Sequence, residues 1–252
     1  MLELRGVRKY FEPDKLVLED LDLTLEEGEF LSLIGPSGCG KSTILRLVAG
    51  LIEPSEGCIE QGNTGARLAY VFQDATLLPW LTVRENAVLP LRIQGIDSET
   101  RYAAGGHFLD LVGLADVADY YPRELSGGMR MRVSIARALA TEPDLLLLDE
   151  PFGALDEMTR DSLNEELLRL RDFSHWTAMF VTHSVAEAVF LSSRVVILAP
   201  NPGTISRIVD IPLPFPRTDK TRQEAYYQSL VVEVSQALRQ VQTNPLTKVD
   251  IL

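Results

Sequence analysis

The 252-residue chain has little cysteine, no long apolar run and no excess of basic residues, and each absence narrows its class. Its two cysteines, Cys39 and Cys58, follow no CxxC or Cys/His spacing, so a structural zinc is not indicated. A structural disulfide is not expected either, because Cys39 lies inside a glycine-rich loop, and reduced thiols suit a cytosolic protein. No apolar run approaches the ~20 residues that a membrane-spanning helix needs.

Acidic residues outnumber basic ones: the chain has 24 Lys and Arg and 36 Asp and Glu, which gives a net charge of −12. A nucleic-acid-binding surface needs clustered Lys and Arg, so we expect no nucleic-acid partner. Residues 1–5 lack the apolar core of a signal peptide, which favours a location inside the cell. The length allows one large α/β domain or a domain with a sizeable insertion.

The most informative stretch, residues 35–43, fits the phosphate-binding pattern G-x-x-x-x-G-K-[ST]. Glycines let the backbone curl so closely that its N–H groups can surround a polyphosphate. Lys41 would place a positive charge on the β- and γ-phosphates, and the Ser42 hydroxyl can ligate Mg²⁺. The predicted phosphate-binding residues are Gly35, Pro36, Ser37, Gly38, Cys39, Gly40, Lys41, Ser42 and Thr43.

The elements on either side support this motif. Residues 30–34 form an apolar run typical of a buried strand, and residues 41–49 predict a helix that ends at Gly50. Further strands are predicted at residues 2–7, 20–25, 68–72, 145–148, 178–181, 195–198 and 204–211. Further helices are predicted at residues 98–112, from 126, 157–171 and 227–241. This alternation implies a parallel sheet with helices on both faces.

Two other segments have the chemistry of nucleotide hydrolysis. The strand at 145–148 ends in Asp149 and Glu150, where one carboxylate can hold Mg²⁺ and the other can deprotonate an attacking water. Residues 125–129 form a second glycine-rich turn, which opens a helix at Ser126 and offers another anion-binding N-terminus. Each has an ordinary alternative: a solvated acid at a strand end, and a simple helix cap.

Taken in order, the motifs resemble those of the ATP-binding cassette (ABC) family, the ATPase subunits of membrane transporters. The resemblance covers almost the whole chain to about residue 216. It rests on residues 35–43, Gln73, residues 125–129, Asp149-Glu150, residues 154–156 and His183. One departure is Met131, where the family often has a polar Gln; a local polar contact is therefore in doubt.

The resemblance implies a fold and a division of the chain. The expected fold is an α/β P-loop NTPase with a RecA-like parallel sheet core, an N-terminal antiparallel β subdomain and an inserted α-helical subdomain. The expected parts are residues 1–84, the β subdomain and first part of the ATP-binding core; 85–140, the helical subdomain with the signature motif; 141–216, the rest of the core; and 217–252, a C-terminal helical extension and tail.

The resemblance also implies a role for each motif residue. Adenine would be contacted by Tyr10 and Val17. Mg²⁺ would be held by Ser42, Gln73 and Asp149, with Gln73 also linking the attacking water to the permease. Catalysis would use Glu150 as general base and His183 as a switch near the γ-phosphate. The ATP of a second protomer would be contacted by the signature residues Leu125, Ser126, Gly127, Gly128 and Met129. The loop crossing to that protomer would comprise Ala154, Leu155 and Asp156. One chain therefore cannot complete a site, and we expect a homodimer on ATP binding.

Residues 73–86 and 182–191 are similar to the importer branch for nitrate, sulfonates, taurine or thiamine-precursor pyrimidines. That branch implies permease subunits, an extracytoplasmic substrate-binding protein and a peripheral position on the cytoplasmic face of the membrane. Residues 77–86 are predicted to help receive a permease helix, with internal packing as the alternative. The alternatives are a soluble cassette ATPase of translation or DNA repair and an exporter ATPase. Residues 247–250 match the letters of a GTPase guanine reader by chance, because they follow Asn244-Pro245 with no predicted strand before them.

Overall fold

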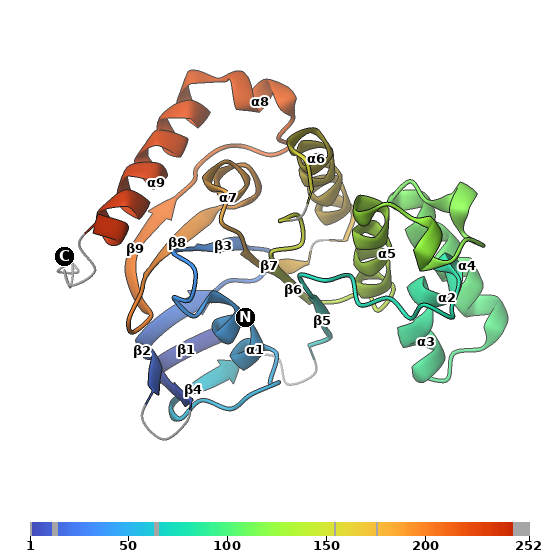
Figure 1. Cartoon of the computed structure of the whole chain (residues 1–252), viewed down its shortest axis with the longest axis horizontal. Helices are drawn as coiled ribbons and strands as arrows, with labels where there is room; N and C mark the ends of the chain where they lie inside the picture. Colours follow the sequence, from blue (N-terminus) through green and yellow to red (C-terminus); the bar gives the residue numbers. More distant parts are fainter. Residues whose placement is uncertain (1, 12–14, 63–65, 154, 175, 244–252) are drawn as a thin grey trace. The chain divides into compact units, whose positions relative to one another are not determined.

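The computed structural model describes residues 2–11, 15–62, 66–153, 155–174 and 176–243, and these form two compact units. The first unit combines Met1–Ala66 with Thr177–Leu252, and the second is Arg67–Trp176 (Figure 1). Each unit contains part of the sequence motifs described above. No described helix combines the length and hydropathy that crossing a membrane requires.

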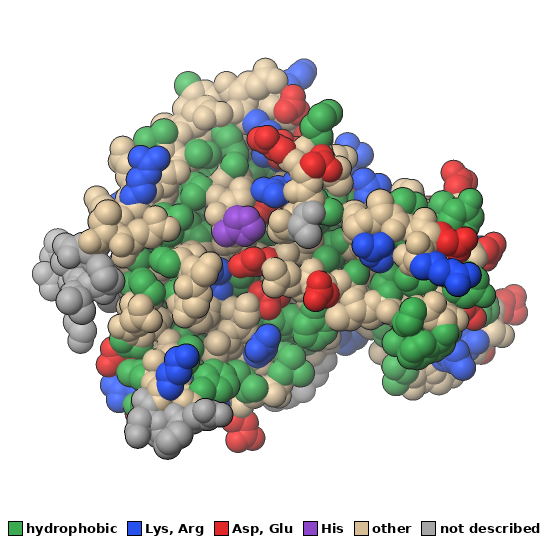
Figure 2. All heavy atoms as spheres, in the orientation of Figure 1, with side chains coloured by type: hydrophobic (Ala, Val, Ile, Leu, Met, Phe, Trp, Pro, Cys, Tyr) green, Lys and Arg blue, Asp and Glu red, His purple; other side chains and the backbone are tan. Residues whose placement is uncertain are grey.

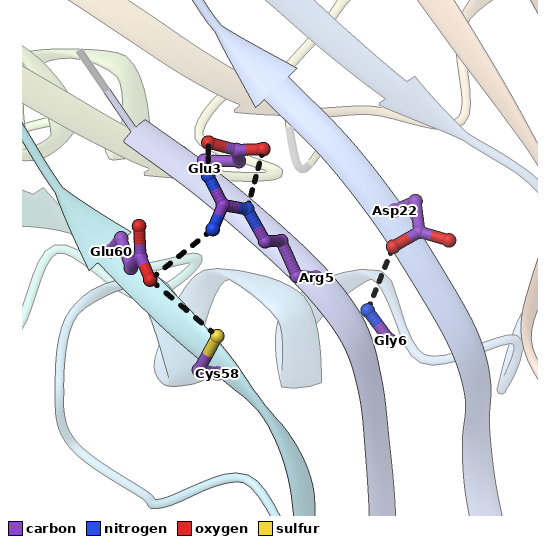
Figure 3. Close-up of polar contacts among 6 residues, drawn as sticks. All are labelled: Glu3, Arg5, Gly6, Asp22, Cys58 and Glu60. Atoms are coloured by element: carbon purple, nitrogen blue, oxygen red, sulfur yellow. Dashed lines mark hydrogen bonds and ion pairs between the residues drawn. The ribbon is translucent and has the colours of Figure 1, made fainter.

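The first unit contains an antiparallel three-stranded sheet, with β1 (Leu2–Phe11) between β2 (Lys15–Leu25) and β4 (Glu56–Gln61). On its outer surface Arg5 binds Glu3 and Glu60, which raises the pKa of Arg5 and lowers that of Glu3 (Figure 3). The sequence did not indicate β4. Its residues are exposed or half-buried throughout, so they form no apolar pattern.

The first unit also contains a mixed sheet that carries the phosphate-loop motif. Strand β3 (Phe30–Ile34) runs parallel to β7 (Thr177–Val181) and β8 (Arg194–Ala199), and β9 (Thr204–Asp210) pairs antiparallel with β8. The central strand β3 is buried along its whole length, as its apolar run predicted. The parallel arrangement thus places the carboxyl ends of β3 and β7 side by side.

Four helices accompany these strands: α1 (Lys41–Val48), α7 (Val185–Leu191), α8 (Asp219–Gln223) and α9 (Ala225–Thr243). Helix α9 packs on α7, where the rings of Tyr227 and Phe190 meet edge to face and the Tyr227 hydroxyl donates to the Ala186 carbonyl at 3.0 Å. Arg217 precedes α8 and donates to five backbone carbonyls, including that of Leu213 at 2.9 Å. The C-terminal segment is therefore part of the folded core of this unit.

The second unit pairs two parallel strands, β5 (Leu68–Val71) and β6 (Leu145–Asp149), and its other described elements are α-helices and two short 3-10 helices, η1 (Ala115–Val117) and η2 (Pro122–Glu124) (Figure 1). Its helices are α2 (Val83–Ala87), α3 (Leu89–Ile93), α4 (Ser98–Leu111), α5 (Gly127–Leu139) and α6 (Glu157–Ser174). Helix α4 forms despite the Gly105-Gly106 pair. A β-carbon on Gly105 would lie 2.1 Å from Val88 Cγ1, so this glycine permits close packing.

Candidate functional site

The phosphate loop connects β3 to α1 and is built around its own backbone. Lys41 is 7% exposed, and its ammonium donates to the carbonyl oxygens of Gly35 at 2.9 Å and Pro36 at 3.2 Å. Gly38 and Gly40 have φ values of 81° and 97°, in the left-handed region that glycine adopts without strain. The loop therefore curls around the position of the lysine head group.

Two of the motif glycines are also required by close packing. A β-carbon on Gly40 would lie 2.4 Å from Leu18 Cδ2, and one on Gly35 would lie 2.8 Å from the Leu198 carbonyl oxygen. Leu18 belongs to β2 and Leu198 to β8, so the antiparallel sheet and the parallel strands both bound the loop. The glycine spacing thus reflects packing as well as ligand geometry.

Helix α1 begins directly after the loop, and its N-cap residue is Gly40, which has no capping side chain. The backbone end of the helix, rather than a side chain, is therefore presented at the loop. Its positive dipole end and Lys41 favour the same kind of ligand, a bound anion. This geometry fits the phosphate groups of a nucleotide.

Three more predicted site residues, Tyr10, Val17 and His183, lie in the first unit. Val17 Cγ1 lies 3.6 Å from where a Gly40 β-carbon would be, and Tyr10, 36% exposed, pairs with the neighbouring Leu16 in the β1–β2 ladder. His183 is exposed and follows β7, whose end is tied to the loop strand by the Thr182 N–H to Leu33 carbonyl bond of 3.3 Å.

The carboxylates lie in the second unit, at the end of β6. Asp149 is 7% exposed and accepts a hydrogen bond of 3.0 Å from the Tyr70 hydroxyl on the neighbouring strand β5. Glu150 is half-buried and has a φ of 45°, a conformation that costs a non-glycine residue about 1–3 kcal/mol. Gln73 is exposed and follows the parallel strand β5, so its backbone leaves the same sheet edge as Asp149.

The signature segment forms the start of helix α5, as the sequence predicted. Ser126 is the N-cap, and its hydroxyl oxygen accepts a 3.2 Å bond from the Met129 N–H. Gly128 is buried, and a β-carbon there would lie 3.3 Å from Thr159 Cγ2 in the first turn of α6 and 3.6 Å from Leu155 Cδ2 just before that helix. Met131 is also buried, so an apolar side chain fills the position at which the family often has a polar Gln.

Asp156 organises the first turn of α6. Its carboxylate accepts from the Thr159 N–H at 3.0 Å and from the Thr159 hydroxyl at 2.7 Å. These two hydrogen bonds hold the pKa of Asp156 below its usual range. Leu155 is half-buried beside Gly128, whereas Ala154 and the segment 247–250 lie outside the described residues.

Sequence reasoning missed several residues that shape these segments. Arg137 on α5 donates to the backbone just after Gln73, and Asn86 on α2 bonds the backbone of residues 78–82. Gly203, in the turn between β8 and β9, packs on the phosphate loop. None carries a local signal, because a helical Arg, a helical Asn and a turn glycine usually serve no ligand.

A sequence profile of the ABC transporter family matches residues 18–153, more than half of the chain. The chain is therefore a member of the ABC transporter family, and it is an ATP-binding cassette that hydrolyses ATP. The family resemblance and the P-loop NTPase fold predicted from the motifs are both confirmed.

Among curated relatives, the nitrate import ATP-binding protein NrtD of Synechocystis is 42% identical over 252 residues, covering 94% of this chain and 95% of that protein. The bicarbonate transport ATP-binding protein CmpC of Synechococcus elongatus is 48% identical over 235 residues, 89% of this chain but 35% of that longer protein. These relatives confirm the prediction that the chain is similar to the importer branch that includes the nitrate ATPases.

Among solved structures, a dimeric post-hydrolysis state of the cassette MJ0796 bound to ADP and Pi is similar to this chain. It matches with a TM-score of 0.75 and 31% identity, covering 85% of this chain and 100% of that one. A second dimeric structure of MJ0796 matches with a TM-score of 0.76 and 32% identity, at the same coverage.

Proposed function

We propose that this ATPase powers the import of a small anion through a membrane permease. The observation that carries the proposal is the match to the nitrate import protein along nearly the full length of both chains. Nitrate and bicarbonate, the solutes in the names of two relatives, are both small oxyanions. The solute would be selected by the permease and an extracytoplasmic binding protein, and the ATPase would not contact it.

For nucleotide binding, the proposal assigns the phosphates to residues 35–43 and the adenine to Tyr10 and Val17. The loop geometry supports this assignment, since Lys41 and the start of α1 provide positive charge at one place. The partly exposed ring of Tyr10 can stack on a base without needing to leave the sheet. His183 would approach the γ-phosphate from the end of β7.

Mg²⁺ would be held by the Ser42 hydroxyl, the Gln73 side chain and Asp149, together with phosphate oxygens. The described residues contain no group of three or more His, Cys, Asp or Glu that would make a protein-only metal site. The set still fits, because Mg²⁺ prefers oxygen ligands and is usually held by one or two carboxylates plus phosphates. When bound, Mg²⁺ would neutralise phosphate charge, while Glu150 would take the proton of the attacking water.

Two copies would close head to tail, so that residues 125–129 of each meet the nucleotide of the other. Ser126 is exposed at the N-terminal end of α5, the positive end of the helix dipole, which supports this role. Leu155 and Asp156, together with Ala154, would form the crossing loop between protomers. Under this proposal the chain has four functional parts: residues 1–84 and 141–216 for ATP binding, 85–140 for the signature and 217–252 as a C-terminal extension.

The permease would dock against residues 77–86, placing the ATPase on the cytoplasmic face of the membrane. Trp80 is 69% exposed within this segment, and Ile93 of α3 is 78% exposed. Figure 2 shows hydrophobic side chains gathered at the surface over α2 and α3. Large exposed apolar groups at one place are typical of an interaction surface.

Affinity purification from detergent-solubilised membranes tests the proposal most directly. The tagged full chain should recover an integral-membrane permease, and a Trp80→Glu variant with intact ATPase activity should recover less of it. Reconstituted with that permease and its binding protein, the wild-type chain should drive uptake of labelled nitrate or bicarbonate. Recovery of ribosomes or DNA instead would favour a soluble cassette ATPase, and efflux would favour an exporter.

A further inference from the structure

Arg137 makes a concentrated set of contacts with the backbone that follows Gln73. Its guanidinium donates to the Thr76 carbonyl at 3.0 Å, to the Ala75 carbonyl at 2.9 Å and to the Thr76 hydroxyl at 3.1 Å. Arg137 lies on α5, the helix that begins at Ser126. One planar side chain therefore joins the signature helix to the segment containing Gln73.

The backbone that Arg137 holds is not in a relaxed conformation. Thr76 has a φ of 46°, which is unfavourable for a β-branched residue and persists only where the surroundings enforce it. Asn86 fixes the other end of the segment, accepting from the Leu78 N–H at 2.8 Å and donating to the Leu81 carbonyl at 3.1 Å. The segment is thus held at both ends by side chains from helices.

We propose that Arg137 is a positioning residue that couples the signature helix to Gln73, so that movement of α5 moves the residue beside the reacting phosphate. This inference rests on the role proposed for Gln73. Desolvation lowers the pKa of Arg137, a cost of burial that its hydrogen bonds to the segment offset. The contacts are made to Ala75 and Thr76, the second and third residues after Gln73, so a loss of order there would reach Gln73 over two or three peptide bonds.

The test begins with the full chain carrying Arg137→Ala, Arg137→Lys and, as a control for loss of one arginine, Arg169→Ala. The Arg169 side chain is 75% exposed and forms an ion pair with Glu165 at 3.9 Å. The fluorescence of Trp80 reports on the order of the segment that Arg137 and Asn86 hold. Acrylamide quenches mainly this exposed ring, because Trp176 is buried. Arg137→Ala should increase quenching of Trp80, Arg137→Lys should give a smaller increase, and the control should match the wild type.

The kinetic test measures kcat and KM for ATP in Arg137→Ala, Gln73→Ala and the double variant. Misplacing Gln73 should lower kcat on the order of 10–100-fold with little change in KM. The double variant should be no slower than Gln73→Ala, since Arg137 acts through that residue. Losses that multiply, or unchanged Trp80 quenching, would overturn the inference.

Two further outcomes remain decisive. If Gln73→Ala hydrolyses ATP at the wild-type rate, the role proposed for Gln73 is wrong, and Trp80 quenching alone decides whether Arg137 holds the segment. If Arg137→Ala fails to fold, Thr76→Ala replaces it, because that change removes one acceptor of the guanidinium and leaves α5 intact. Wild-type quenching and kcat in Thr76→Ala and Arg137→Lys together would then refute the inference.

Discussion

A β-carbon on Gly203 would lie 2.1 Å from the carbonyl oxygen of Cys39, so only glycine lets the β8–β9 turn meet the phosphate loop. The contact is reinforced on the other side of the turn, where the Gly203 N–H donates to the Val17 carbonyl at 2.8 Å. Leu18 also lies within 2.9 Å of that β-carbon position. The wall of the phosphate loop is therefore built from two segments distant in sequence.

We predict that Gly203→Ala destabilises the chain and weakens ATP binding together. The added methyl must displace backbone, and overpacking of this kind costs about 1–3 kcal/mol. Thermal unfolding should show a lower Tm, and the KM for ATP should rise. Gly106→Ala is the matched control, because a β-carbon there meets nothing within 4 Å in helix α4 and alanine favours a helix. Equal behaviour of the two variants would contradict the prediction.

We predict that Lys41→Ala removes nucleotide binding or turnover. Without its ammonium, the loop keeps its glycines but no longer places a full positive charge at the phosphates. Nucleotide titration and phosphate release at saturating Mg-ATP measure the effect. Lys220→Ala, at an exposed position of α8, removes the same charge elsewhere and should leave both values unchanged. Wild-type binding and turnover in Lys41→Ala would refute the site assignment.

The two carboxylates at the end of β6 should have separable effects. Glu150→Gln should still bind Mg-ATP, turn it over at least ~100-fold more slowly, and accumulate as a closed dimer. Asp149→Asn should lose Mg²⁺-dependent affinity as well, because the group hydrogen-bonded to Tyr70 would no longer carry charge. Gel filtration with and without Mg-ATP, alongside phosphate release, separates them. If Glu150→Gln keeps the wild-type rate, the general base lies elsewhere.

Composite sites should be revealed by mixing two inactive chains. Lys41→Ala breaks the phosphate loop and Ser126→Arg breaks the signature, so a mixed dimer has one intact site and one doubly broken site. Each variant alone should be inactive, and the mixture should recover part of the wild-type ATPase activity. Absence of recovery, once mixed dimers are shown by differential tagging, would count against sites shared between two protomers.

The chemistry of the site could be predicted from the sequence because its motifs are local. The spacing of Gly35, Gly40 and Lys41 along the chain already predicts a curled loop before a helix. Serine is among the preferred N-cap residues, and Ser126 has that role in α5. The apolar runs at β3 and β6 likewise predicted buried strands that end in the functional segments. Covalent spacing and local hydrogen bonding were sufficient for these features.

Tertiary structure decided the features that depend on distant partners. Strand β4 has no apolar pattern and forms because β1 offers it an edge to pair with. Gly105, which weakens a helix on propensity alone, is tolerated because Val88 packs where its side chain would lie. Arg137 and Gly203 have no special local pattern; they matter because folding brings a guanidinium to the Ala75 carbonyl and a turn against Cys39. Sequence neighbours determine which groups a segment offers, whereas packing and long-range hydrogen bonds determine what those groups meet.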